Sequence, residues 1–256
     1  MHYLLDNCED KKVVKLWEKY ESKVYVGNTN IAPDKAHYAP YSNKINFNLK
    51  DTAKGSDYES KYQTLFHESG HAIDRSINRE KGTNRLNYSL TYKDGLFPDT
   101  IEKEAKQRID TINEELKALF KEHKTDYEWL YKNGMLRDYY YFNWKTTGEI
   151  KTTLKYSKRF AYQKIQKEIK TIPLDCRGNL SDIMEGATYG KIKAGIGHGV
   201  SYWKKHKIQD TNNGLAAEAF AEMLDATIAS KKSLDSIIKY FPESYKIFKQ
   251  MIEEVL

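Results

Sequence analysis

The sequence predicts an α+β fold, in which a small mixed sheet and its helices form one domain with further helices inserted into it. Three patterns in the chain support this prediction. Apolar and polar residues alternate across 45–49, as in a half-buried strand. Apolar residues recur every three or four positions across 62–77 and again across 101–119, as in amphipathic helices. A chain of 256 residues can form one large domain or a domain with an insertion.

Residues 1–97 are expected to contain a helix, a short strand, a second strand and a longer helix. Val13, Val14, Leu16 and Trp17 give the first helix its apolar side, and residues 24–26 suit a strand. The longer helix has Ser56 or Asp57 as a candidate N-cap and an apolar stripe of Tyr62, Phe66, Gly70, Ile73 and Ile77. Glycine weakens a helix by roughly 1 kcal/mol relative to alanine. We therefore expect Gly70 to be required by a close backbone approach, such as that of the helix to the sheet.

Residues 98–170 are predicted to be a helical insertion. They contain a long amphipathic helix, a tyrosine-rich middle and a basic helix near 148–170. The insertion could be a structural lid or spacer, or it could recognise a partner through exposed tyrosines. Residues 171–256 are expected to return to the first domain and to end in short helices.

The most informative motif is His67-Glu68-Ser69-Gly70-His71, an H-E-x-x-H sequence within the predicted helix. Two histidines four residues apart lie on the same face of a helix, so both rings can reach one zinc ion. Glu68 lies too far round the helix to be a ligand, and it is well placed to take a proton from water. Asp74 lies on the same side as the histidines and could orient them.

A catalytic zinc ion usually has a third protein ligand. Glu218, Glu222 and Asp225 recur at spacings of four and three in an alanine-rich, otherwise apolar segment. A row of acids on such a helix needs a partner if it is buried, and a zinc ion with two histidines would be one. The alternative is a partly exposed helix with ordinary surface acids.

The segment Glu218-Ala-Phe-Ala-Glu222 resembles the E-x-F-A-E segment of the lethal-factor-type zincins, which also occurs in phage minor head and head-morphogenesis proteins. The segments 37–49, 181–188, 197–203 and 241–252 resemble the phage-associated branch. The similar segments follow one another in the same order along the chain, between residues 37 and 252. The resemblance implies a zincin-like catalytic domain with Glu218 as the third zinc ligand. It also implies that Glu222 lies in the outer shell of the metal.

In zincins an edge strand before the metal helix pairs with an extended substrate. The resemblance therefore implies substrate binding along Ile45, Asn46, Phe47, Asn48 and Leu49. Zincins also often use a histidine or tyrosine to stabilise the oxyanion of the transition state. His198 and Tyr202, in and after the glycine-rich loop 195–199, are the candidates. Alternatively, His198 caps the loop and Tyr202 packs in the core.

Composition and charge narrow the class of protein. No apolar run of 18 residues and no signal peptide is visible, so we expect a cytoplasmic or virion-associated protein without a membrane span. The two cysteines, Cys8 and Cys176, are expected to be free thiols. A net charge of +6 is modest and spread along helices, which makes nucleic acid an unlikely partner.

The sequence thus predicts an endopeptidase with one Zn²⁺ per chain, which cleaves an extended peptide or protein with Glu68 as general base. Two alternatives remain at this stage. One is a phage-associated structural protein, with a phage head or a larger chain as its partner, whose zinc domain has little or no catalytic activity. The other is an intracellular effector or toxin protease.

Overall fold

The computed structural model describes residues 1–32, 35–57, 59–82, 87–150, 153–195, 197–203 and 213–256. The chain divides into two compact units. Unit 1 comprises Met1–Ala105 and Ile169–Leu256, and unit 2 comprises Lys106–Glu168. Most described residues are helical, and unit 1 also contains a three-stranded mixed sheet. The α+β class is therefore as predicted.

The sheet contains three short strands, β1 (Tyr25–Val26), β2 (His37–Ala39) and β3 (Lys44–Asn46). Their order is β1-β3-β2, with β1 parallel and β2 antiparallel to β3. The prediction of an edge strand at Ile45–Leu49 is therefore wrong, because β3 is the middle strand and has a neighbour on each side. The edges of the sheet that these residues form are β1 and β2.

The backbone after β3 is also already paired. The N–H groups of Phe47 and Leu49 donate to the carbonyl oxygens of Asn28 and Thr29, at 3.1 and 3.0 Å. Asn48 caps α3 (Leu49–Lys54) with its side chain, so Leu49 is helical. This segment cannot take an added strand along the β1 side, and Ile45, Asn46, Phe47, Asn48 and Leu49 do not form the substrate-binding edge that the resemblance implied.

The apolar residues of β3 attach the sheet to α4 (Gln63–Glu80). Ile45 and Phe47 are only 1% and 3% exposed, and they cluster with Leu65 and Ala72 of α4. The period-2 alternation in the sequence therefore identified the buried face of the strand, as expected for a sheet with one covered side.

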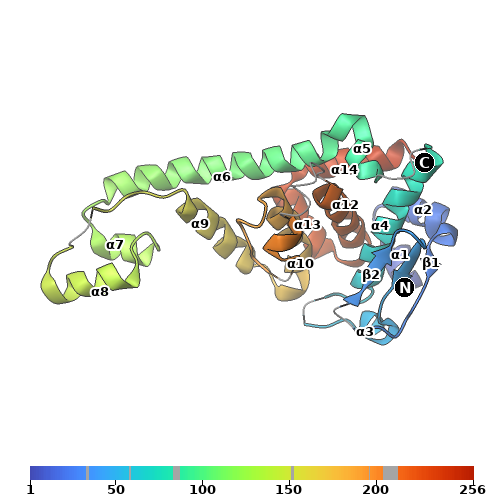
Figure 1. Cartoon of the computed structure of the whole chain (residues 1–256), viewed down its shortest axis with the longest axis horizontal. Helices are drawn as coiled ribbons and strands as arrows, with labels where there is room; N and C mark the ends of the chain where they lie inside the picture. Colours follow the sequence, from blue (N-terminus) through green and yellow to red (C-terminus); the bar gives the residue numbers. More distant parts are fainter. Residues whose placement is uncertain (33–34, 58, 83–86, 151–152, 196, 204–212) are drawn as a thin grey trace. The chain divides into compact units, whose positions relative to one another are not determined.

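The centre of unit 1 is α12 (Asn213–Ala229), whose residues from 214 to 228 are all buried. It packs against α4 on one side and against α10 (Leu174–Ala187) and α13 (Lys231–Tyr240) on others, as Figure 1 shows. A helix that is apolar all round belongs in a core. The acids of this helix are consequently enclosed, and the alternative of a partly exposed helix is wrong.

The other helices of unit 1 surround this centre. Trp17 packs edge-on against Phe66 of α4, and Phe248 packs edge-on against Phe220 of α12. Cys8 and Cys176 are buried free thiols, as predicted. These surrounding helices are α1 (His2–Asn7), α2 (Lys11–Tyr20), α5 (Tyr88–Thr91) and α14 (Pro242–Glu253).

Unit 2 contains most of α6 (Leu96–Glu122) and α9 (Arg159–Lys170), with α7 (Tyr127–Lys132) and α8 (Asp138–Thr147) between them. The basic helix expected near 148–170 is shorter than predicted, because residues 153–158 are not part of a regular helix. In α7 and α8, Tyr131 and Tyr141 stack with ring centroids 3.7 Å apart.

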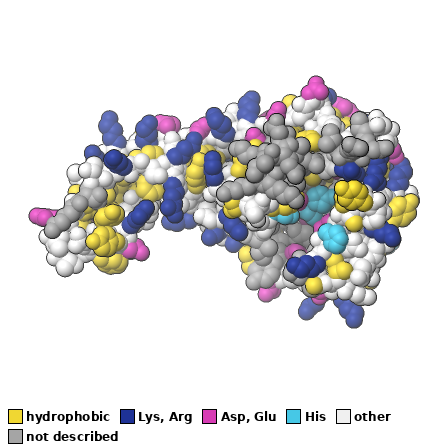
Figure 2. All heavy atoms as spheres, in the orientation of Figure 1, with side chains coloured by type: hydrophobic (Ala, Val, Ile, Leu, Met, Phe, Trp, Pro, Cys, Tyr) yellow, Lys and Arg dark blue, Asp and Glu magenta, His cyan; other side chains and the backbone are white. Residues whose placement is uncertain are grey.

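On the face drawn in Figure 2, the Lys and Arg side chains are spread along the chain and are not gathered in one patch. Among the described helices, none combines the length and the apolar character that crossing a bilayer requires.

Candidate metal centre

Helix α4 begins at Gln63 and presents His67 and His71 one turn apart. The preceding residue, Tyr62, has a left-handed backbone with φ 63°. The N–H of Ser60 donates to the Gln63 side chain at 2.8 Å, which satisfies one polar group at the start of the helix. Ser56 and Asp57 are therefore not its caps, because the helix begins several residues after them.

Gly70 allows α4 and α12 to approach closely. A Cβ atom added to Gly70 would lie 2.7 Å from the Cα of Ala221, which is closer than real Cβ contacts. The close approach predicted for this glycine exists, but the neighbour is a helix rather than the sheet. Small residues on both helices bring the histidines of α4 opposite the acids of α12.

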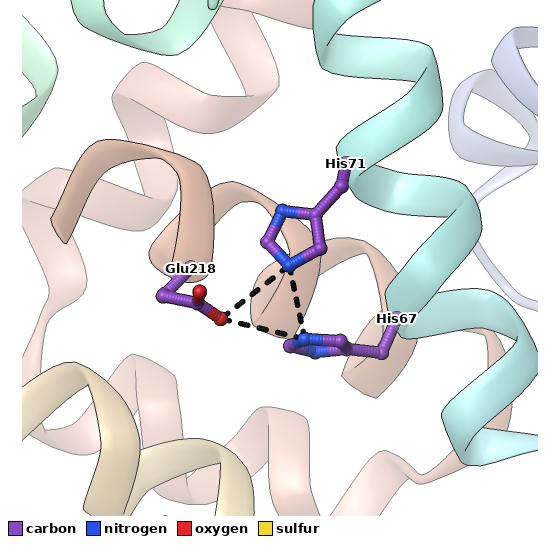
Figure 3. A group of neighbouring side chains, drawn as sticks. All are labelled: His67, His71 and Glu218. Atoms are coloured by element: carbon purple, nitrogen blue, oxygen red, sulfur yellow. Dashed lines mark hydrogen bonds and ion pairs between the residues drawn. The ribbon is translucent and has the colours of Figure 1, made fainter. Parts of the chain in front are cut away.

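The side chains of His67, His71 and Glu218 point toward one another from these two helices (Figure 3). The Nε2 atoms of the two histidines are 3.1 Å apart. Oε2 of Glu218 lies 3.4 Å from each of these nitrogens. Two nitrogens and one carboxylate oxygen on one small triangle could hold a metal ion.

This geometry fits a zinc ion. Tetrahedral bonds of about 2.0–2.2 Å place ligand atoms roughly 3.3–3.6 Å apart, close to the spacing of the triangle. Oε2 of Glu218 is buried and faces the two histidine nitrogens at 3.4 Å, without a hydrogen bond of normal geometry from the described residues. A buried carboxylate needs a positive partner, and a metal ion bound by all three residues would provide one. The donor set therefore suits Zn²⁺ in type, number and spacing.

The charges of the three residues depend on one another. Burial would raise the pKa of Glu218, but the nearby His71 and His67 outweigh it and hold the pKa well below its usual range. Burial would lower the pKa of His67, but the carboxylates of Glu222 and Glu218 raise it well above its usual range. Without metal, the site therefore favours an ionised Glu218 beside a protonated His67. A metal ion would have to displace that proton.

Glu222 contacts the same centre from one turn further along α12. Its Oε1 atom lies 3.5 Å from Nδ1 of His67, the ring nitrogen that does not face Glu218. Its Oε2 atom accepts a hydrogen bond from the Asn179 side-chain amide at 2.5 Å. This arrangement is consistent with the predicted outer-shell position, in which a carboxylate orients a ligand histidine.

Asn179 of α10 was not identified from the sequence. Its amide also donates to Asp225 at 2.7 Å, and its carbonyl oxygen accepts from the Gln63 amide at 3.2 Å. Asn179, Asp182 and Glu185 recur at a spacing of three within an apolar helix, and all three are buried. That spacing was the available signal for a polar face directed at the site.

Asp74 lies on α4, three residues after His71. It is fully buried and accepts hydrogen bonds from both the N–H and the hydroxyl of Ser89, at 2.7 and 2.6 Å. Burial raises the pKa of Asp74 to about 7, although the Ser89 hydrogen bonds and the charge of His71 oppose this rise. The described hydrogen bonds thus connect Asp74 to α5, and its influence on His71 is electrostatic.

Glu68 lies on the wall of a cleft that also contains the histidines. It is 7% exposed and is not one of the three residues that form the metal-sized triangle. The cleft has a volume of about 1350 Å³, and its lining includes Ala36, His37, Tyr38 and Pro40 in and beside β2. The sheet edge at this cleft is therefore β2.

His198 and Tyr202 both lie at the centre. The Tyr202 hydroxyl donates to Oε1 of Glu218 at 2.7 Å, and Nε2 of His198 lies 3.7 Å from the same oxygen. The two rings stack with centroids 4.0 Å apart. Burial and then the charge of Glu218 raise the pKa of Tyr202, which keeps its hydroxyl protonated.

Asp182 of α10 contacts both the backbone and the ring of His198. Its Oδ1 accepts the His198 backbone N–H at 3.0 Å, and its Oδ2 lies 2.8 Å from Nδ1 of the ring. Burial would lower the pKa of His198, but Asp182 and Glu218 raise it to about 9. The sequence did not identify Asp182, because its partner lies in a loop 16 residues away.

No protein-family model, curated protein or solved structure matches this chain. The structure itself defines an α+β protein with a two-histidine, one-glutamate group that could hold a metal ion.

Proposed function

We propose that this chain is an endopeptidase with a zincin-like catalytic domain and one Zn²⁺ bound by His67, His71 and Glu218. The observation that carries the proposal is the triangle of two Nε2 atoms and one carboxylate oxygen, with sides of 3.1, 3.4 and 3.4 Å. It lies in an open cleft beside a buried glutamate that is not one of its members. A ligand set of this kind with space for a fourth partner is typical of catalytic rather than structural zinc.

The bound zinc ion would supply a Lewis acid that polarises a peptide carbonyl and acidifies water. Glu68 would accept the proton of the attacking water and pass it to the leaving amine. His198 and Tyr202 would donate hydrogen bonds to the oxyanion, because both have a polar atom directed at the Glu218 carboxylate. Glu222 would orient His67 through its Nδ1 atom.

The substrate would bind as an extended strand along β2. β2 is an edge of the described sheet, and its residues line the cleft that contains the histidines. The backbone of an edge strand can pair with an added peptide, while the side chains of that peptide alternate between the two faces. This replaces Ile45–Leu49 as the expected substrate-binding segment.

The first test is metal content. The purified chain should contain about one zinc ion, and Glu218→Ala should lose it, because two histidines alone hold zinc poorly. Metal analysis by mass spectrometry after exhaustive dialysis measures both. Full retention of zinc by Glu218→Ala would contradict the ligand assignment.

The second test separates metal binding from catalysis. Glu68→Gln should keep its zinc but lose roughly 10²- to 10⁴-fold in kcat, because it removes the base and leaves the metal ligands unchanged. Glu80→Gln is the matched control, since Glu80 is on the same helix but at its far end, paired with Lys23. Cleavage products from a broad peptide library, identified by mass spectrometry, give the readout. A native protein that binds zinc and cleaves nothing in the library would instead favour a non-catalytic zinc domain.

A further inference from the structure

The loop that carries His198 lies directly on one face of α10. A Cβ atom at Gly195 would be 3.1 Å from the Ser181 hydroxyl, and one at Gly197 would be 2.6 Å from Oδ1 of Asp182. The second distance is closer than real Cβ contacts, so a side chain at position 197 would displace the Asp182 carboxylate. The two glycines therefore let the loop backbone reach α10, where Asp182 can accept the N–H of His198.

One carboxylate consequently determines two features of His198. Through Oδ1 it holds the backbone, and through Oδ2 it contacts the ring at Nδ1. An ionised carboxylate only accepts hydrogen bonds, so Nδ1 must carry a proton. Nε2 is then directed away from Asp182, to within 3.7 Å of Glu218 Oε1. Stacking on Tyr202 and an edge contact with Trp203 limit rotation of the ring.

We propose that Asp182 is a positioning residue that accepts the backbone N–H and the ring Nδ1–H of His198 and thereby directs the Nε2–H of the ring into the cleft beside Glu218. The catalytic consequence of this arrangement rests on the proposed peptidase function, because only then does Nε2 meet a developing oxyanion. The orientation of the ring by Asp182 does not depend on that function.

A second metal ion is the competing explanation for this group. Atoms of Asp182, His198 and Glu218 also lie close enough together to suit a cation. However, both oxygens of Asp182 already accept hydrogen bonds from His198, and Asp182 contacts Nδ1 while Glu218 is close to Nε2. Because each oxygen of Asp182 already has a partner on His198, the hydrogen-bonded pair is favoured over a second ion.

The decisive experiment is two-bond ¹H–¹⁵N correlation NMR of the histidine rings, in the metal-free protein and after addition of one equivalent of Zn²⁺. The His198 signal is assigned as the one missing from His198→Gln. We expect native His198 to carry a proton on Nδ1, in contact with Asp182, as well as one on Nε2 in both samples. In Asp182→Asn, whose amide can donate to Nδ1, the Nδ1 proton should be lost and only Nε2 should carry one.

Glu185→Gln is the matched control, because it removes another buried carboxyl one turn along the same helix. Its His198 signal should stay like that of the native protein. A native His198 protonated on Nε2 alone would overturn the proposal, and this result needs no variant to fold. An Asp182→Asn spectrum identical to the native one would also overturn the proposal. A second zinc equivalent bound by the native chain and lost in Asp182→Asn would establish the metal site instead.

The activity of the zinc-loaded protein gives an independent readout. Asp182→Asn should lower kcat by roughly 10- to 100-fold with an unchanged zinc content and little change in KM, because it acts through His198 on the transition state. If Asp182→Asn loses the Nδ1 proton but the native chain cleaves no peptide, the proposed function fails while the positioning role stands. If the chain is a peptidase and kcat is unchanged in Asp182→Asn, the positioning role has no catalytic consequence.

Discussion

The pKa values of three acids on one helix are shifted in different directions by their surroundings. The pKa of Glu218 is lowered by two facing histidines despite its burial. Burial raises the pKa of Glu222, and burial together with the charge of Glu222 raises that of Asp225 well above its usual range. Glu218 is therefore the one of the three that is best suited to meet a cation as a carboxylate.

A fourth acid, Glu185, provides a test of burial at the scale of one residue. It is fully buried, and neither of its oxygens accepts a hydrogen bond from the described residues. Burial and then the charge of Asp182 raise its pKa from 4.5 to about 7. Between these two values the folded chain binds a proton that the unfolded chain does not, so the free energy of unfolding falls as pH rises.

We expect Glu185→Gln to remove this dependence on pH. Between pH 4 and pH 8, the free energy of unfolding of the variant should rise by roughly 3 kcal/mol relative to that of the native chain. Each unit of pKa shift corresponds to about 1.4 kcal/mol. Urea unfolding of both proteins at a series of pH values measures the difference between their free energies of unfolding. The contributions of the other titrating groups are the same in both proteins and cancel in this difference. A native-minus-variant difference that is constant across this range would show that Glu185 is not held in its neutral form.

At the scale of the elements, the candidate metal centre depends on the distance between α4 and α12. Its two histidines and its glutamate lie on different helices, and Gly70 sits where α4 closely approaches Ala221 of α12. Helix packing normally places axes 8–10 Å apart, depending on the side chains at the contact. A glycine at this contact therefore sets the position of one half of the site relative to the other.

Gly70→Ala should consequently destabilise the fold by about 1–3 kcal/mol, as overpacking does, although alanine is the better helix former. It should also weaken zinc binding, because it moves His67 and His71 away from Glu218. Gly178→Ala in α10 is the control: nothing lies within 4 Å of its added Cβ, so it should be neutral or stabilising. Thermal unfolding and competition with a chromogenic chelator measure the two effects. Equal behaviour of the two variants would exclude the close-contact explanation.

At the scale of the whole molecule, the candidate site belongs to unit 1 alone. His67, His71, Asp182, His198 and Glu218 all lie outside Lys106–Glu168. The two ends of unit 2 are close together, because Arg108 and Glu168 form an ion pair of 2.8 Å. A short connection could therefore replace this unit without a long span.

We predict that a chain in which about eight Gly and Ser residues replace 106–168 still folds and binds one zinc ion. A linker of this length spans roughly 15 Å on average. Circular dichroism and metal analysis test the prediction, and loss of fold or zinc would show that unit 1 needs unit 2. Cleavage assays then distinguish the roles left open for the insertion. A spacer can be removed without loss of cleavage, whereas a recognition unit cannot.

The parts of the site that follow from local chemistry were accessible from the sequence. His67 and His71 share a face because any helix places residues four apart together. The acids of α12 could be expected to be buried because alanines and apolar residues surround them. The alternation around Ile45 and Phe47 likewise identified a strand with one covered face.

Only the tertiary structure decided how segments that are distant in the chain lie relative to one another. β3 is the middle strand because β1, which precedes β2 in sequence, pairs on its other side. Gly70 meets Ala221 rather than the sheet, and Asn179 and Asp182 reach the site because α10 lies beside α12. Local periodicity defines which face of an element is buried, but it carries no information on which distant element covers that face. That choice is made by the packing of the whole core, and so the supporting residues of this site became visible only in three dimensions.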